Sequence, residues 1–171
     1  PGPLDTSASE YLRENGNLQV FSSVLENIRG HALTSDGTLA VTLHGTSEHI
    51  VPYMRDLTTG DESVLFESSS VDTHSVSVSD DGEIVVFASD GVFPSIPDSN
   101  GVLDVYSYDR ATATFHRLST SDRENGEPCR QPVISGDGSV TAFVTPSDVF
   151  LPGGTGNDRV ILVGADGFEC A

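Results

Sequence analysis

The sequence predicts an all-β chain of repeated four-stranded antiparallel blades, and the following observations carry that prediction. An Asp-Gly turn between two alternating apolar runs occurs three times, with turn glycines at Gly37, Gly82 and Gly138. These glycines lie 45 and 56 residues apart, a spacing that suits a four-stranded unit and exceeds that of a heptad or leucine-rich repeat. The composition agrees, because 17 Gly and 9 Pro occur without long helical periodicity. No helix longer than a turn or two is expected.

The same register appears away from the turns, where an isolated Asp-Gly would be only a generic hairpin signal. Phe21 and Phe66 each lie sixteen residues before a turn glycine. The tyrosine-containing runs at residues 11–14, 53–56 and 105–109 also stand at equivalent places in their units. Each unit therefore reads as strands a, b, c and d, with the Asp-Gly turn between a and b and the tyrosine run as c.

An acidic residue ends each tyrosine run, namely Glu14, Asp56 and Asp109. A carboxylate at this position can accept hydrogen bonds from the backbone N–H groups of the next turn. We therefore expect these residues to close the c–d turns.

The repeat count sets the domain organisation. We expect thirteen strands, arranged as a half blade of strands c and d, two full blades, and a third blade whose last strand is only a stub at residues 168–171. The predicted boundaries are residues 1–8 for an unstructured terminus or the remnant of a cleaved tag, 9–24 for the half blade, and about 29–67, 73–119 and 130–171 for the three blades.

Two segments resemble a known repeat. Residues 132–138 (Pro-Val-Ile-Ser-Gly-Asp-Gly) and 98–110, which contain Asp-Val-Tyr-Ser-Tyr-Asp-Arg, resemble the WD-like β-propeller repeat of TolB-type proteins. The resemblance covers nearly the whole chain after about residue 9. It departs from the pattern in the short b–c loop of the first blade and at residues 158–163, which lack the tyrosines. It implies a β-propeller, a functional face formed by the d–a and b–c loops at the mouth of a central channel, and a periplasmic or secreted location.

Thirteen strands make just over three blades and do not close a propeller, because closed rings have about four to eight blades. An open arc would expose the apolar faces of its two outer sheets. Two arrangements would cover them: a homodimer in which two copies form one ring of about six blades, each N-terminal half blade completing a blade of the other copy, or a longer propeller of which this chain is one part. The frequency of two-fold dimers favours the first.

The charge restricts the partners. The chain carries 26 carboxylates against 8 cations, all of them arginine, and its net charge is −18. Such a surface repels phosphate backbones, so neither nucleic acid nor an anionic membrane is expected as a partner. No apolar run approaches the roughly 20 residues of a membrane span, so membrane insertion is not expected. The absence of lysine points to a GC-rich bacterial genome.

Three residues that are or can become cationic recur at one repeat position. Arg29, His74 and Arg130 each lie eight residues before a turn glycine, at the entry to strand a. Because strand a is the innermost strand of a blade, these side chains would lie near the channel mouth and could clamp a ligand carboxylate or phosphate. The alternative is ordinary pairing of each arginine with a nearby carboxylate.

The longest b–c loop holds a candidate metal site. Asp98, Asn100 and Asp104 place oxygen ligands at i, i+2 and i+6, and Gly101 permits a sharp turn between them. This layout overlaps a short calcium loop, although the remaining ligands of such a loop are missing. The alternative is a hydrogen-bonded polar turn that leads into strand c. No other cofactor is expected.

Catalytic signatures are missing from the sequence. It contains no Gly-x-Ser-x-Gly elbow, no His-Glu-x-x-His and no glycine-rich phosphate loop, and neither Cys129 nor Cys170 has the context of a nucleophile. We therefore expect a non-enzymatic module that recognises a protein, a peptide or a small anionic ligand on its loop face. The competing hypothesis is an enzyme or a domain of one, such as a hydrolase or lyase built on a propeller or the gating propeller of a prolyl-oligopeptidase-type peptidase, with Asp72, His74 and Asp122 near the mouth.

Overall fold

The computed structural model confirms the predicted all-β fold. It describes residues 11–14, 17–20, 27–46, 49–66, 73–93, 96, 98, 100–119, 127–146 and 158–164. These residues form thirteen strands in sheets of two, four, four and three strands, and they contain no helix. None of the described residues therefore forms a helix that could cross a membrane. The expected terminus at residues 1–8 and the expected strand stub at residues 168–171 lie outside the described residues.

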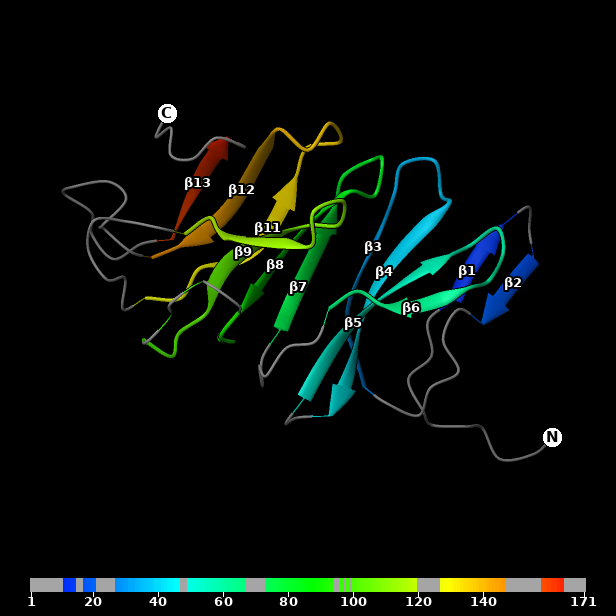
Figure 1. Ribbon diagram of the computed structural model, residues 1–171, viewed down its shortest axis with the longest axis horizontal. Coiled ribbons are helices and arrows are strands. Elements are labelled where there is room, and N and C mark those ends of the chain that lie inside the picture. Colours follow the sequence, from blue (N-terminus) through cyan, green and yellow to red (C-terminus); the bar gives the residue numbers. More distant parts are fainter. Residues whose placement is uncertain are drawn as a thin grey trace.

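Strands that follow one another in sequence pair antiparallel within each sheet (Figure 1). The two-stranded sheet consists of β1 (Tyr11–Glu14) and β2 (Asn17–Val20). The first blade consists of β3 (Asn27–Leu33), β4 (Leu39–Thr46), β5 (His49–Asp56) and β6 (Glu62–Val64). The second blade consists of β7 (Thr73–Val78), β8 (Ile84–Ser89), β9 (Asp104–Asp109) and β10 (Thr114–Arg117), and the third of β11 (Arg130–Ile134), β12 (Val140–Thr145) and β13 (Arg159–Gly164).

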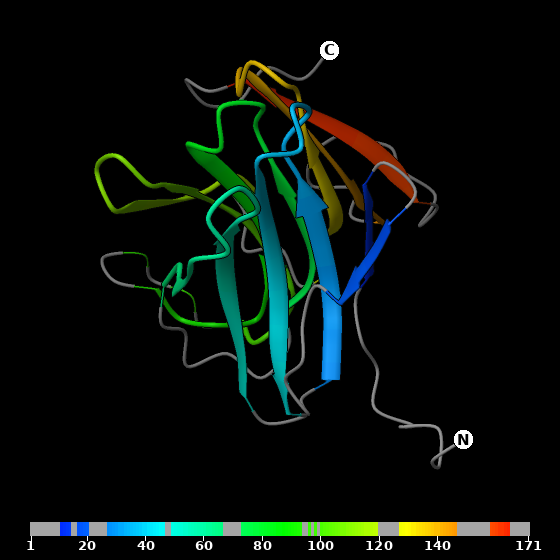
Figure 2. The ribbon, with the colours of Figure 1, turned by 90° about the vertical axis from the view of Figure 1, so that its right-hand side faces the viewer.

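The blades stand next to one another with their first strands on one side. β7 contacts both β3 and β11, so the innermost strands of neighbouring blades lie side by side. Figure 2, turned by 90° from Figure 1, shows the first blade in front with the other blades behind it. This is the arrangement of sheets around a common axis that a propeller requires.

The three a–b turns share one hydrogen-bonding pattern, which explains the repeated sequence. The carboxylates of Asp36, Asp81 and Asp137 each accept the backbone N–H two residues further on, at 2.9, 3.0 and 3.0 Å. Each also accepts the hydroxyl two residues earlier, at 2.6 to 2.7 Å. Hydrogen bonds from Ser135 and Ser139 lower the pKa of Asp137 to about 2. The turn glycines that follow these carboxylates have φ between +70° and +74°, a conformation that favours glycine.

The predicted role of the acidic residues after strand c is confirmed at two positions. Asp56 Oδ1 accepts the N–H groups of Thr58 and Thr59 at 2.7 and 3.1 Å. Asp109 Oδ1 does the same for Ala111 and Thr112 at 2.8 and 3.2 Å. The side chain of Glu14 lies outside the described part.

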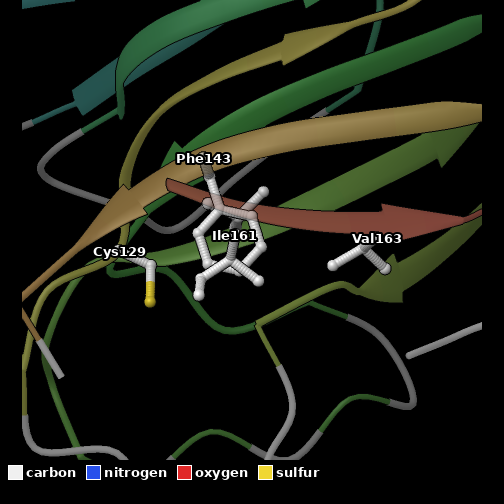
Figure 3. Packing of buried hydrophobic residues seen from close by; sticks show 5 residues of the cluster. Cys129, Phe143, Ile161 and Val163 are labelled. Carbon is white, nitrogen blue, oxygen red and sulfur yellow. The ribbon is translucent and has the colours of Figure 1, made fainter. Parts of the chain in front are cut away.

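Apolar side chains fill the spaces between blades. Between the first and second blades lie a cluster of Val41, Met54, Val78 and Val85 and an aromatic cluster of Phe66, Phe87, Phe93, Tyr106 and Tyr108. Between the second and third blades lie Val105, Cys129, Phe143, Ile161 and Val163 (Figure 3). Burial raises the pKa of the Cys129 thiol to about 11, so this thiol stays protonated at neutral pH. Cys170 lies outside the described residues.

Candidate ligand-binding site

The three residues predicted for the clamp lie where the innermost strands are irregular. The register of β3 on β4 shifts at Arg29, that of β7 on β8 shifts at His74, and that of β11 on β12 shifts directly after Arg130. β-Bulges bend a strand, re-aim a side chain, and occur often next to functional sites. The same strand of every blade is therefore bulged at or beside the predicted position.

The bulge of the third blade includes an unusual backbone conformation. Gln131, which follows Arg130 in β11, has φ of +54°, in the left-handed region that few residues other than glycine adopt. Pro132 lies beside it and cannot donate a backbone hydrogen bond to the sheet. Such outliers cost about 1–3 kcal/mol and tend to cluster at functional sites.

Among the side chains of Arg29, His74 and Arg130, the structure describes the contacts of Arg130 alone. Its Nη2 lies 2.7 Å from Oδ1 and 2.8 Å from Oδ2 of Asp158, which directly precedes β13. Both side chains are partly exposed, at 37% for Arg130 and 57% for Asp158. The guanidinium thus holds a carboxylate that water can reach, and this is the ordinary pairing that the sequence left open. For Arg29 and His74 only the strands are described, so a three-residue clamp stays a prediction.

The residues of the candidate calcium site make hydrogen bonds within the protein. Asp98 accepts the Tyr106 hydroxyl at 2.9 Å and the Asn100 N–H at 3.2 Å. Asn100 in turn accepts the Val102 N–H at 3.1 Å. These contacts are those of a polar turn. Within the described part of the chain, no three His, Cys, Asp or Glu residues gather as metal ligands would, and calcium binding stays a prediction.

Asp104, the third of these residues, belongs to a buried network that the sequence did not reveal. Its side chain is fully buried, and Oδ2 lies 2.6 Å from Nη2 of Arg117. Ser119 Oγ donates to Oδ1 at 2.6 Å and accepts the Val105 N–H at 3.0 Å. Burial raises the pKa of Asp104, and the hydrogen bond from Ser119 and the charge of Arg117 oppose that rise. An Asp at the start of strand c and an Arg at the end of strand d were the available signal, because an antiparallel hairpin brings these ends together.

The acid–base alternative involves residues from the d–a loops. His74 is the second residue of β7. Asp72 and Asp122, the carboxylates considered beside it, lie outside the described residues. His116 on β10 is exposed.

No family model matches this chain, and no curated protein matches it significantly. The fold does resemble solved structures. TolB from Acinetobacter baumannii aligns with a TM-score of 0.66 at 17% identity, over 92% of this chain and 35% of that one. A putative TolB from Agrobacterium tumefaciens gives 0.65 at 16% identity, over 94% and 54%. Oligogalacturonate lyase from Vibrio parahaemolyticus gives 0.58 at 17% identity, over 94% and 42%.

The chain thus spans between 35% and 54% of the length of these three proteins. A binding or catalytic role does not follow from this likeness, because one fold hosts many functions. The common feature is the arrangement of antiparallel blades. The chain has a TolB-type β-propeller fold, present here as part of a propeller.

Proposed function

We propose that this chain is a non-enzymatic binding module that recognises a carboxylate- or phosphate-bearing group of a protein, a peptide or a small ligand at the inner ends of its blades. Support comes from one observation above all: every innermost strand is bulged at or beside the repeat position of Arg29, His74 and Arg130. A bulge kept in three copies at the same place suggests a use beyond folding. The periplasmic or secreted location that the resemblance implies belongs to the same proposal.

The contact between Arg130 and Asp158 indicates how binding would occur. Both carboxylate oxygens of Asp158 lie within hydrogen-bonding distance of one guanidinium nitrogen, so this carboxylate occupies the place that a ligand anion would take. Exposed ion pairs contribute only about 0–1 kcal/mol, so an incoming anion can displace Asp158 at little cost. In a chain of net charge −18, few other positions would attract an anion.

Titration with citrate and with inorganic phosphate, followed by calorimetry, tests the proposal. Arg29→Ala and Arg130→Ala should each weaken binding about tenfold, since a hydrogen bond to a charged group contributes roughly 1.5–3 kcal/mol. Asp158→Asn should tighten binding several-fold because it removes the competing carboxylate. Arg55→Ala is the matched control, since Arg55 forms an exposed pair with Glu62 at 3.8 Å on another strand pair. Unchanged binding in both clamp variants would refute the proposal.

The competing function is a propeller-based enzyme or the propeller domain of one. A general acid or base beside His74 would be needed for it, and Asp72 and Asp122 are the candidates. Turnover of a uronate polymer or a peptide that disappears in His74→Ala and persists in His116→Ala would favour the enzyme.

A further inference from the structure

Neighbouring blades contact each other in the same way at their a–b turns. Gly82 of the second blade packs on Leu39 at the start of β4, and a Cβ added at Gly82 would lie 2.5 Å from Leu39 Cδ1. Gly138 of the third blade packs in the same way on Ile84 at the start of β8, where the distance would be 3.4 Å. The rule for an internal contact is therefore that the turn glycine of one blade lies on the first residue of strand b of the preceding blade.

The face that the second blade turns toward the third is closed by this contact. Val86, Ala88 and Val105 lie on that face and are fully buried. Val105 belongs to the cluster that includes Phe143 and Ile161 of the third blade. Packing between blades therefore removes this face from water.

The corresponding face of the third blade is open. Of the aliphatic side chains that strand register places on it, four have exposed fractions between 40% and 65%. We call this surface the docking face; it consists of Val133, Val140, Val160 and Leu162. Val140 is the first residue of β12, so it occupies the position on which an a–b turn glycine lies in both internal contacts.

The first blade carries the complementary half of the same contact. A Cβ added at Gly37 would meet nothing within 4 Å, although the equivalent glycines touch a preceding blade. Leu33 at the end of β3 is 48% exposed, whereas its counterpart Val78 is 8% exposed and packs with Val41 of the first blade. The turn glycine and the residue beside it thus lack the neighbour that they have in the second blade.

We propose that the docking face of one copy of this chain receives the a–b turn of a second copy, with Gly37 of the second copy lying on Val140 of the first. This proposal does not depend on the proposed ligand site. The occupant is a second copy because the chain carries both halves of the contact, the docking face on the third blade and the open a–b turn on the first, and these two blades lie on opposite sides of the second blade (Figure 1). Two copies provide six blades, within the range of closed propellers, and two head-to-tail contacts close a ring with two-fold symmetry.

Sedimentation velocity across micromolar concentrations provides the first test. The wild-type chain should form a dimer, and Gly37→Asn should weaken it at least about tenfold, because the added side chain has to fit against Val140. Asn tolerates the positive φ of +70° at Gly37, so the variant should fold. Gly60→Asn is the matched control: Gly60 has φ of +81°, nothing lies within 4 Å of an added Cβ, and its turn joins β5 to β6. This control should dimerise like the wild type.

A second variant tests the other half of the contact. Val140→Asp should also give monomers, whereas Val92→Asp should not, since Val92 is 59% exposed in the loop after β8. Mixing the Gly37→Asn and Val140→Asp chains should restore association at one junction, where an intact docking face meets an intact turn. Circular dichroism of each variant verifies that it has folded.

The outcomes separate the alternatives. A wild-type chain that stays monomeric at high concentration would overturn the proposal, and so would an open series of oligomers larger than a dimer. A dimer that survives Gly37→Asn but not Val140→Asp would show two docking faces packed on each other, which also overturns it. Failure of mixing to restore association would exclude the head-to-tail contact.

Discussion

At the scale of single residues, the network around Asp104 shows how this acidic chain tolerates a buried carboxylate. Asp104 is fully buried, and removing a carboxylate from water costs several kcal/mol unless a cation and hydrogen bonds compensate. Arg117 at 2.6 Å supplies the charge, and Ser119 at 2.6 Å supplies a hydrogen bond. The three residues lie at the open end of the β9–β10 hairpin, where its first and last residues meet, so they also hold the two strands together there.

Removing the cation Arg117 from this network should lower the free energy of unfolding far more than removing an exposed cation. Arg117→Leu leaves the Asp104 carboxylate buried without a counter-charge, and we expect a loss of about 3–5 kcal/mol in the free energy of unfolding. Arg55→Leu is the matched control; its partner Glu62 lies 3.8 Å away and both side chains are 30% exposed, so the loss should be about 0–1 kcal/mol. Urea denaturation measures both values.

A double variant makes the cause explicit. Adding Asp104→Asn to Arg117→Leu removes the uncompensated charge and should recover part of the lost stability. If the two arginine variants lost the same stability, or if Asp104→Asn gave no recovery, the uncompensated Asp104 charge would not explain the effect of Arg117→Leu.

At the scale of strands and turns, much of the fold could be predicted because its signals are local. Side-chain hydrogen bonds within six residues close each a–b turn, so the Asp-Gly repeat was enough to locate them and to number the strands. The bulges at Arg29 and His74 could not be predicted in this way. A bulge is a shift in register between two strands, and the residues opposite it lie more than ten positions away in the sequence.

The position of the candidate site could be predicted from the sequence, but the contacts of its side chains could not. Repeat spacing brought Arg29, His74 and Arg130 to one position of the blade. The partner of Arg130 could not be predicted, because Asp158 is 28 residues further along the chain. The pairing of the third blade's strands brings it close, since it directly precedes β13. The buried contacts of Asp104 could not be predicted for the same reason: the loop pattern around it was visible, whereas Arg117, which pairs with its carboxylate, lies on the neighbouring strand.

If turn glycines pack on the preceding blade, replacing one of them should lower the free energy of unfolding. Gly82→Asn places a side chain against Leu39 and beside Arg110, whose guanidinium donates to the Gly82 carbonyl at 2.9 Å. Overpacking of this kind costs about 1–3 kcal/mol. Gly60→Asn should change the free energy of unfolding by less than about 0.5 kcal/mol, because its surroundings are open. Thermal and urea unfolding provide the comparison, and equal losses would show that backbone conformation alone explains these glycines.

At the scale of the whole molecule, charge and apolar surface act against each other. The net charge of −18 per chain keeps copies apart in dilute buffer, whereas the docking face favours their association. An apolar contact depends little on ionic strength, but the repulsion between two acidic copies falls as the Debye length shortens from about 30 Å at 0.01 M salt to about 8 Å at 0.15 M. Salt therefore weakens the repulsion between copies and leaves the apolar contact nearly unchanged.

Screening of the net charge predicts the salt response of both proposed interactions. Raising sodium chloride from about 0.01 to 0.15 M should strengthen self-association, on the order of tenfold, because it screens the repulsion between copies. The same change should also strengthen the binding of citrate, because it screens the repulsion between the citrate carboxylates and a chain of net charge −18, whereas the contact with Arg130 lies well within one Debye length at either concentration. Sedimentation velocity measures the first response and calorimetry the second, each with wild-type chain and with Arg130→Ala. A dimer that dissociated as salt rose would mean that ion pairs hold the copies together, in place of the aliphatic contact around Val140.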